Sequence, residues 1–254
     1  MAEFNEHSVF NVDEMANAVI GIATRVGKHD SGMHQHQKGQ LLYAPEGCMS
    51  IYLNGIKCVL PPTRAAWIPA KTPHYARMTN VVEYRSLYFD PSLNASLPSS
   101  LKIVEVNPLL KALIERMAFW EWDKPQSEQA NTTALFLEEL ANAREELLQL
   151  PLPTDRRLHD WLDQLNDPTY IVPPLNQLCL SIGASGKTIS RIFSRETGMA
   201  YQAWRQQWRL LKSIELLSEG LQVNDVAYQL EFSSDSAFVS FFKQQTGTTP
   251  FQYL

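Results

Sequence analysis

Cysteine is scarce in this sequence, and the three cysteines, Cys48, Cys58 and Cys179, lie far apart. Such spacing builds neither a disulfide framework nor a zinc site made of thiolates. No apolar run approaches the roughly 18 residues that a membrane span needs. The N-terminal segment lacks the cationic-then-apolar layout of a signal peptide. We therefore expect a cytoplasmic protein without a membrane span.

Positive charge is also in short supply. The chain has 22 Lys and Arg residues against 27 Asp and Glu, a net charge of −5. An acidic balance argues against nucleic acid as a partner. The charge is uneven, however, because residues 178–212 hold six basic residues and one acidic residue. Residues 101–153 and 213–254 are acidic, so the total hides one basic region.

The composition predicts folded domains, because 44% of the 254 residues are apolar and no segment is of low complexity. Up to about residue 90, short apolar or alternating runs are separated by turn residues, which is typical of a small β-barrel or sandwich. Asn54-Gly55, between SIYL and IKCVL, is a strong hairpin signal. We expect residues 1–100 to form this small barrel or sandwich.

From Asn107 the apolar period becomes helical, and one face of the first helix would carry Leu109, Leu113 and Met117. A second helix is expected from Glu128 to Leu150, and the proline-rich segment 151–154 is typical of a linker. We expect residues 101–153 to couple the two ends of the chain and to form a homodimer face. The alternative is that these helices only cover an open edge of the barrel.

The last eighty residues contain an internal repeat. The pattern Ile189-x3-Phe193-x4-Gly198 recurs 49 residues later as Phe238-x3-Phe242-x4-Gly247. Each copy reads as a short helix, a turn, and a second helix that a serine opens. Two such units are predicted helix-turn-helix motifs, at residues 174–196 and 222–245, whose second helices can enter the major groove of DNA. Residues 200–219 would join them as one helix.

In the first copy, the apolar stripe leaves a face of donors and small hydroxyls on the second helix, which suits guanine edges and phosphates. Its members are Lys187, Ser190, Arg191, Ser194 and Arg195. The alternative is an ordinary solvated helix face that carries cations.

Residues 155–254 resemble the DNA-binding domain of the AraC-type transcription regulators. The resemblance rests on ISRIFSRETGMAYQAWRQQWRLLKSIELL and VNDVAYQLEFSSDSAFVSFFKQQTGTTPFQYL. It implies an α+β multidomain protein with an N-terminal cupin-like barrel, a helical linker and, over residues 154–254, an all-α domain with both motifs. It also implies a set of DNA-facing residues: Ser185, Lys187, Thr188, Ser190, Arg191, Arg195, Ser234, Asp235, Ser236, Val239, Ser240 and Lys243.

The second motif departs from the family pattern at two points. Glu231 stands where the family usually has a glycine, as Gly183 does in the first motif, and a positive φ there would strain it. The second recognition face has Lys243 as its one cation and carries Asp235, which repels phosphate. We therefore expect the first motif to supply most of the affinity for DNA.

In the N-terminal region, GMHQHQKGQLLYAPEG and WIPAKTPH resemble the two short motifs of the cupin barrel. Metal-binding cupins would use two histidines, a glutamate and a final histidine, but Gln40 stands at the glutamate position. A neutral amide does not neutralise a metal ion. We therefore expect no cofactor and a metal-free pocket. Its expected ligand-binding residues are His34, His36, Gln40, Tyr43, Trp67 and His74.

A metal ion held by His34, His36, Gln40 and His74 is the alternative for this pocket, and another is that the histidines only cap strand ends. The phrase LPPTRAAWIP is similar to regulators with a cupin-like sensor domain. The resemblance implies a regulator whose binding to double-stranded DNA a small-molecule effector modulates. RNA polymerase would be a partner if it activates. The competing hypotheses are a cupin-type metalloenzyme with a helical appendage and a protein-interaction module that no longer binds DNA.

Overall fold

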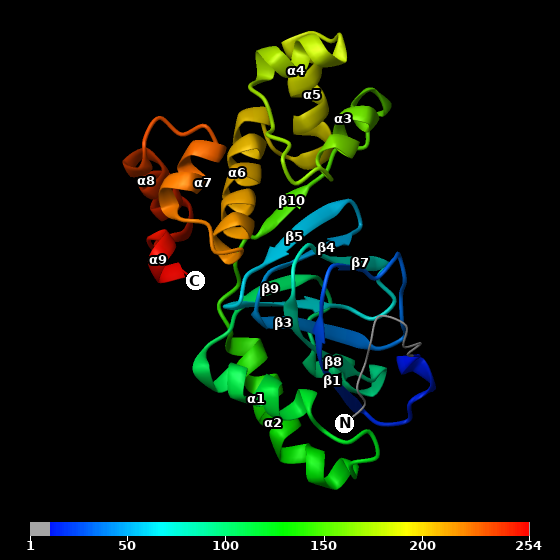
Figure 1. Cartoon of the computed structure of the whole chain (residues 1–254). Helices are drawn as coiled ribbons and strands as arrows, with labels where there is room; N and C mark the ends of the chain where they lie inside the picture. Colours follow the sequence, from blue (N-terminus) through cyan, green and yellow to red (C-terminus); the bar gives the residue numbers. More distant parts are fainter. Residues whose placement is uncertain (1–10, 254) are drawn as a thin grey trace. The chain divides into compact units, whose positions relative to one another are not determined.

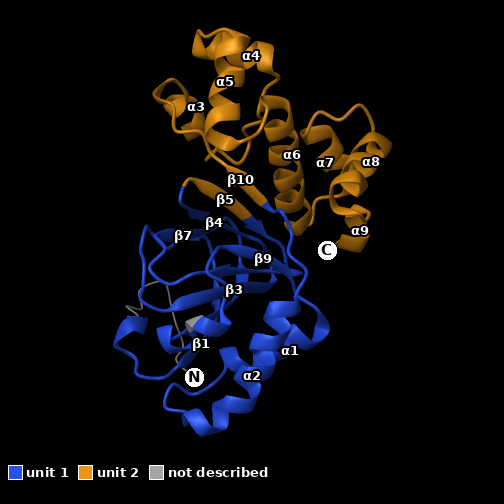
Figure 2. Ribbon diagram, turned by 180° about the vertical axis from the view of Figure 1, so that it is seen from behind, with its two compact units in different colours: residues 1–54, 59–148, 254 blue, residues 55–58, 149–253 orange. Residues whose placement is uncertain are grey.

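The computed structural model describes residues 11–253 (Figure 1). The predicted architecture is confirmed: a β-rich N-terminal region precedes a helical region with two helix-turn-helix motifs. One compact unit comprises the residues up to 54 and 59–148, and the other comprises 55–58 and 149–253 (Figure 2). The segment that we judged not to be a signal peptide lies partly outside the described residues. No helix among residues 11–253 is long and apolar enough to cross a membrane.

Two five-stranded sheets form the β-rich region, with strand orders β1-β8-β3-β6-β9 and β10-β5-β4-β7-β2. The strands are β1 (Val19–Val26), β2 (His29–Asp30), β3 (Gly39–Glu46), β4 (Met49–Leu53), β5 (Ile56–Leu60), β6 (Arg64–Ile68), β7 (His74–Met78), β8 (Val82–Phe89), β9 (Lys102–Glu105) and β10 (Gln149–Pro151). Short 3-10 turns lie at Val12–Glu14, Pro91–Ser96 and Arg156–Leu158.

The predicted hairpin is present between β4 and β5. Asn54 and Gly55 have φ values of 49° and 73°, so both central residues lie in the left-handed region. That conformation is the tight two-residue turn whose twist matches the twist of the flanking strands, and Asn-Gly is its preferred sequence. The dipeptide therefore fixes the register of β4 and β5.

Two helices, α1 (Pro108–Ala118) and α2 (Gln126–Asn142), pack into the same core as the sheet of β1, β8, β3, β6 and β9. Helix α1 begins where the Asn107 side chain accepts a hydrogen bond of 2.8 Å from the backbone N–H of Leu110. Leu113 and Met117 are 6% and 0% exposed, so the predicted homodimer stripe is buried within the unit apart from Leu109, which is 45% exposed. The helices cover a sheet face.

The second helix is shorter than we predicted, because it ends at Asn142 instead of Leu150. The chain after it is extended: Glu145 bridges Val104, and residues 149–151 form β10. Leu147 is 81% exposed and Leu148 is 3% exposed, which is the alternation of a strand. A Leu-rich pattern fits either period, and here pairing with strands supplies the backbone hydrogen bonds.

The C-terminal unit is helical after β10. Its helices are α3 (His159–Gln164), α4 (Leu175–Ile182), α5 (Gly186–Thr197), α6 (Tyr201–Ser218), α7 (Val223–Gln229), α8 (Asp235–Thr246) and α9 (Pro250–Tyr253). Helix α6 is the connector that the sequence predicts, and α5 and α7 both contact it. An aromatic cluster of Trp161, Phe193, Tyr201 and Trp204 forms the core around the first motif.

Candidate ligand cavity and DNA interface

The first helix-turn-helix motif consists of α4, a tight turn and α5. The turn is left-handed at Gly183, with φ of 69°, and α5 begins after Ser185, whose hydroxyl accepts a hydrogen bond of 3.2 Å from the Thr188 N–H. Glycine meets no steric penalty at a positive φ, and serine satisfies a free amide at the helix start. Ser185 therefore serves as the N-cap of α5.

Helix α5 presents the predicted polar face. Ile189, Ile192 and Phe193 are buried, whereas Lys187 and Arg191 are exposed. Neither Lys187 nor Arg191 forms an ion pair with any described residue.

Arg195 is also exposed but pairs with Glu196 and with Asp155. Beside the helix, Arg157, Arg191 and Arg195 line a hollow of about 290 Å³. Sequence reasoning missed Arg157, because it precedes the motif. The hollow brings three guanidinium groups close together, an arrangement suited to phosphate.

Half of the local positive charge does not face solvent. Arg205 is 7% exposed and donates from Nε to the Val172 carbonyl, over 2.8 Å. Arg209 is 8% exposed, donates to the Leu230 carbonyl and lies over the Phe232 ring. Burial lowers the pKa of Arg209 to about 10.

Lys212 forms a salt bridge with Glu215. Most of the exposed positive charge of residues 178–212 therefore lies on α5.

The second motif consists of α7, a longer turn and α8. Ser234 is the N-cap of α8 and accepts from the Ala237 N–H over 3.1 Å. Glu231 has φ of 56°, which is the left-handed conformation expected to strain a residue other than glycine. Its carboxylate lies 3.6 Å from Arg205, but the side chain is 63% exposed. Among the residues of α8 predicted to face DNA, Asp235, Ser236, Ser240 and Lys243 are exposed, and Val239 is half-buried.

A cavity of about 710 Å³ lies in the N-terminal unit. One part of its wall is apolar, with Val12, Ile22, Leu42, Ala76 and Met78. The other part is polar and contains four of the six residues predicted to bind a ligand: His34, His36, Gln40 and His74. The cavity thus combines an apolar surface with one concentrated group of hydrogen-bonding side chains.

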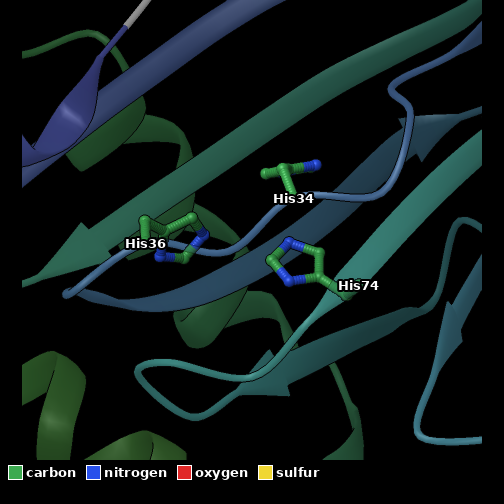
Figure 3. A group of neighbouring side chains, drawn as sticks. All are labelled: His34, His36 and His74. Carbon is green, nitrogen blue, oxygen red and sulfur yellow. The ribbon is translucent and has the colours of Figure 1, made fainter.

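The three histidines come from two segments that the backbone holds together (Figure 3). His34 and His74 form an antiparallel bridge with backbone hydrogen bonds of 3.0 Å and 2.9 Å. Their rings lie 4.5 Å apart, and the His36 ring lies 5.2 Å from that of His74. The side chains therefore form one cluster, as the spacing in the sequence suggested.

Gln40 lies at the centre of the polar group. Its Oε1 faces Nε2 of His36 at 3.2 Å and Nε2 of His74 at 2.9 Å. Its Nε2 donates to the Ser86 hydroxyl over 2.8 Å and to the Tyr88 hydroxyl over 3.0 Å. Sequence reasoning missed Ser86, Tyr88 and the neighbouring Tyr84. The signal was the alternation in VEYRSLYF, which places residues 84, 86 and 88 on one face of β8.

Burial controls the charge state of His36 and His74 and of two neighbouring tyrosines. It lowers the pKa of His36, and it lowers the pKa of His74 to about 4. Burial likewise raises the pKa of Tyr84 and of Tyr88. The imidazoles of His36 and His74 and the phenols of Tyr84 and Tyr88 are therefore uncharged near neutral pH.

Tyr43 and Trp67 do not join this wall. Both are 1% exposed and lie in the core shared with α1 and α2, and the Trp67 indole donates to the Pro98 carbonyl. Successive residues of a strand point to opposite faces, so Gln40 and Leu42 face the cavity while Tyr43 faces the helices. The prediction for these two residues is corrected accordingly.

Comparison with known proteins agrees with both halves of this geometry. The family model described as AraC-like ligand binding domain matches residues 17–143, and the one described as helix-turn-helix domain matches residues 178–254. The chain belongs to the AraC family of transcription regulators. The ligand-binding match precedes the helix-turn-helix match along the chain, and the two compact units have the same order.

Two curated relatives match almost the whole chain. The HTH-type transcriptional regulator NimR of Escherichia coli is 25% identical over 252 residues, which cover 96% of this chain and 90% of NimR. The HTH-type transcriptional activator RhaS of Shigella sonnei is 24% identical and covers 92% of this chain and 91% of RhaS. Among solved structures, fatty-acid-bound ToxT of Vibrio cholerae has a TM-score of 0.41 at 12% identity, covering 94% of this chain and 96% of ToxT.

Proposed function

We propose that this AraC-family regulator reads its operator mainly through α5 and that a small molecule in the cavity of the N-terminal unit changes its affinity for DNA. The observation that carries the proposal is the exposed face of α5, where Lys187 and Arg191 stand free of ion pairs among the described residues. The regulators among its relatives support the same role. As a DNA-binding regulator it would act in the cytoplasm.

The chemistry of α5 suits both parts of DNA recognition. Arg191 can pair with a guanine edge in the major groove, and Lys187 can neutralise a phosphate. The hollow beside α5 places Arg157, Arg191 and Arg195 where one backbone phosphate could replace the acidic partners of Arg195. Helix α8 offers hydroxyls and Asp235 instead, so it would add less affinity.

The cavity defines the kind of effector that fits. Its apolar wall favours a molecule with an apolar body, and the neutral imidazoles, Gln40 and Tyr88 can bond one polar end. An effector changes DNA binding only if it binds one state of the protein better than the other, and such coupling usually amounts to about 1–3 kcal/mol.

DNA binding is tested with the full chain and DNA from upstream of its own gene and the neighbouring genes. Affinity measured by fluorescence anisotropy at several salt concentrations should fall with salt, because phosphate contacts release counterions. We expect Lys187→Ala to reduce the slope of log affinity against log salt by about 1, because Lys187 is the residue assigned to a phosphate. Arg116→Ala, at an exposed position on α1, is the matched control. Binding without any salt dependence would contradict the proposal.

The role of the cavity is tested by filling it. Ala76 is 5% exposed and lines the cavity, so Ala76→Phe would occupy effector space. Ala130→Phe adds the same side chain at an exposed position of α2 and is the control. We expect Ala76→Phe alone to change the response of a reporter gene under the same upstream DNA across growth conditions. An unchanged response would remove the effector role and leave DNA binding intact.

A further inference from the structure

The hollow of about 290 Å³ beside α5 is built from two parts of the C-terminal unit that are separate in the sequence. Arg157 belongs to the 3-10 turn Arg156–Leu158, which precedes both helix-turn-helix motifs. Thr188, Arg191, Ile192 and Arg195 belong to α5. Ile192 is 2% exposed, whereas the arginines are exposed. The hollow therefore combines one buried apolar residue with guanidinium groups that solvent can reach.

Asp155 fixes the Arg157 side chain. Its Oδ1 accepts a hydrogen bond of 2.8 Å from Nε of Arg157, and its Oδ2 accepts one of 2.7 Å from Nη2. The same carboxylate accepts from the backbone N–H of Arg157 over 3.1 Å. A guanidinium group has five N–H donors, and this paired contact uses two of them. The other donors of Arg157 remain for a second acceptor.

Glu196 fastens the segment before the turn to the end of α5. Its Oε2 accepts from the backbone N–H groups of Thr154 and Asp155, over 2.8 Å and 3.0 Å, while its Oε1 accepts from Arg195. The two backbone hydrogen bonds hold the carboxylate in place even when Arg195 turns toward another anion. Glu196 therefore sets the separation between Arg157 on the turn and Arg195 on the helix.

Both carboxylates are ionised at neutral pH. The hydrogen bond from Arg157 holds the pKa of Asp155 well below its usual range, and the hydrogen bond from Arg195 lowers the pKa of Glu196. Three guanidinium groups and two carboxylates therefore leave one net positive charge around the hollow. Neither carboxylate is among the residues that line it, so an entering anion meets the arginines first.

The charge around the hollow matches one class of anion. A phosphodiester of the DNA backbone carries one negative charge, whereas a phosphomonoester carries about 1.5 to 2 near neutral pH. Arginine suits phosphate oxygens because its planar group presents several N–H donors at once. The charge therefore favours a backbone phosphate of DNA over a free phosphate.

We propose that this hollow binds one backbone phosphodiester of DNA, with Arg157 and Arg195 as its contacts and with Asp155 and Glu196 as positioning residues. The proposal rests on the proposed function and extends it, because Arg157 lies outside both helix-turn-helix motifs. Arg191 borders the hollow and also lies on the exposed face of α5, so the phosphate flanks the base pairs that α5 reads. Such a contact carries no sequence information, but it fixes the register of α5 in the groove.

The first test compares two neighbouring arginines in the full-length chain. Arg157→Ala should weaken binding to the upstream DNA about three- to tenfold and reduce the slope of log affinity against log salt by about 1. It should weaken binding to a duplex of shuffled sequence by a similar factor, because a phosphate contact does not depend on sequence. Arg156→Ala is the matched control, since Arg156 is exposed on the same turn but does not line the hollow. It should leave the slope unchanged.

The second test asks whether Asp155 positions Arg157 or only repels DNA. Asp155→Asn keeps the size of the side chain and removes a negative charge, so charge alone predicts tighter binding. We expect weaker binding, by at least about twofold, because Arg157 loses its charged partner. The same substitution in an Arg157→Ala chain should not weaken binding, since no side chain is left to position. Circular dichroism checks that each variant folds.

An unchanged salt slope for Arg157→Ala, or an equal loss for Arg156→Ala, overturns the proposal when the parent chain binds the upstream DNA in a salt-dependent manner. Tighter binding of Asp155→Asn in the parent chain overturns the positioning role. A parent chain that does not bind DNA removes the proposed function, and this proposal with it. Anisotropy of the parent chain therefore distinguishes failure of the proposed function from failure of the hollow alone.

Discussion

The two helix-turn-helix motifs have nearly the same framework. Helices α5 and α8 each have 12 residues, and each begins after a serine N-cap and ends at a left-handed glycine. Even the last turn is repeated: the Thr197 and Thr246 hydroxyls donate to the carbonyls of Phe193 and Phe242, over 2.7 Å and 2.9 Å. The residues that make the fold are thus duplicated.

The outward faces of the same two helices differ. Helix α5 exposes Lys187 and Arg191, whereas α8 exposes Asp235 near its start and Lys243 near its end. Capping and burial constrain the serines, threonines and phenylalanines, but they leave the solvent-facing residues free. The comparison teaches that the framework and the capacity to bind DNA are set by separate residues, so they can be altered separately.

The largest expected difference between the motifs is in DNA affinity. Arg191→Ala should cost about 1–3 kcal/mol, because the side chain is exposed, unpaired among the described residues and able to contact a guanine. Ser240→Ala at the corresponding face of α8 should change affinity far less. Anisotropy with the upstream DNA measures both, and equal losses would contradict the division of work between the motifs.

The turn of the first motif should be sensitive to alanine at Gly183. Gly183 has φ of 69°, and a Cβ there would meet no atom within 4 Å. Gly183→Ala should therefore destabilise the protein by about 1–2 kcal/mol through backbone strain alone. Urea unfolding measures the change, and Gly27→Ala, in open space without a positive φ, is the control. If both variants unfold at the same urea concentration, the turn is not strained.

The N-caps should respond alike. Ser185→Ala and Ser234→Ala each leave one amide at a helix start without its hydroxyl partner. Each should cost about 1 kcal/mol of stability. The same urea experiment tests this symmetry, with Ser194→Ala on the exposed face of α5 as control. A clear difference between the two caps would show that the frameworks are less alike than their geometry indicates.

The smallest effect is expected at Glu231. Glu231→Gly relieves a left-handed conformation at φ of 56°, but glycine costs entropy in the unfolded chain. The ion pair with Arg205 contributes little, because Glu231 is mostly exposed. We expect a stabilisation below about 1 kcal/mol. Destabilisation would show that the carboxylate, rather than the backbone, decides this turn.

Periodic features of the sequence predicted much of the fold. The repeat revealed both motifs because a buried stripe recurs at fixed spacing, and Asn54-Gly55 revealed its hairpin through local backbone preference. The end of α2 could not be predicted in this way. The leucines at 147 and 148 fit a helix as well as a strand, and only pairing with distant strands decides between them.

The candidate sites divide along the same line. The sequence predicted that the histidines and Gln40 line a pocket, because they lie close together within two short segments. The sequence did not reveal that Arg205 and Arg209 are buried, because a count of charges says nothing about the face on which each side chain lies. The partners of Gln40 on β8 also depend on strand pairing: Gln40 lies directly opposite Tyr88.

Helix α6 contacts both α5 and α7, and it is continuous over 18 residues. Each residue of a helix adds about 1.5 Å of length and about 100° of rotation. Gaining or losing one residue within α6 would therefore turn one motif by more than a right angle relative to the other. Homologous chains should vary in length in surface loops and keep the residue count of this helix constant.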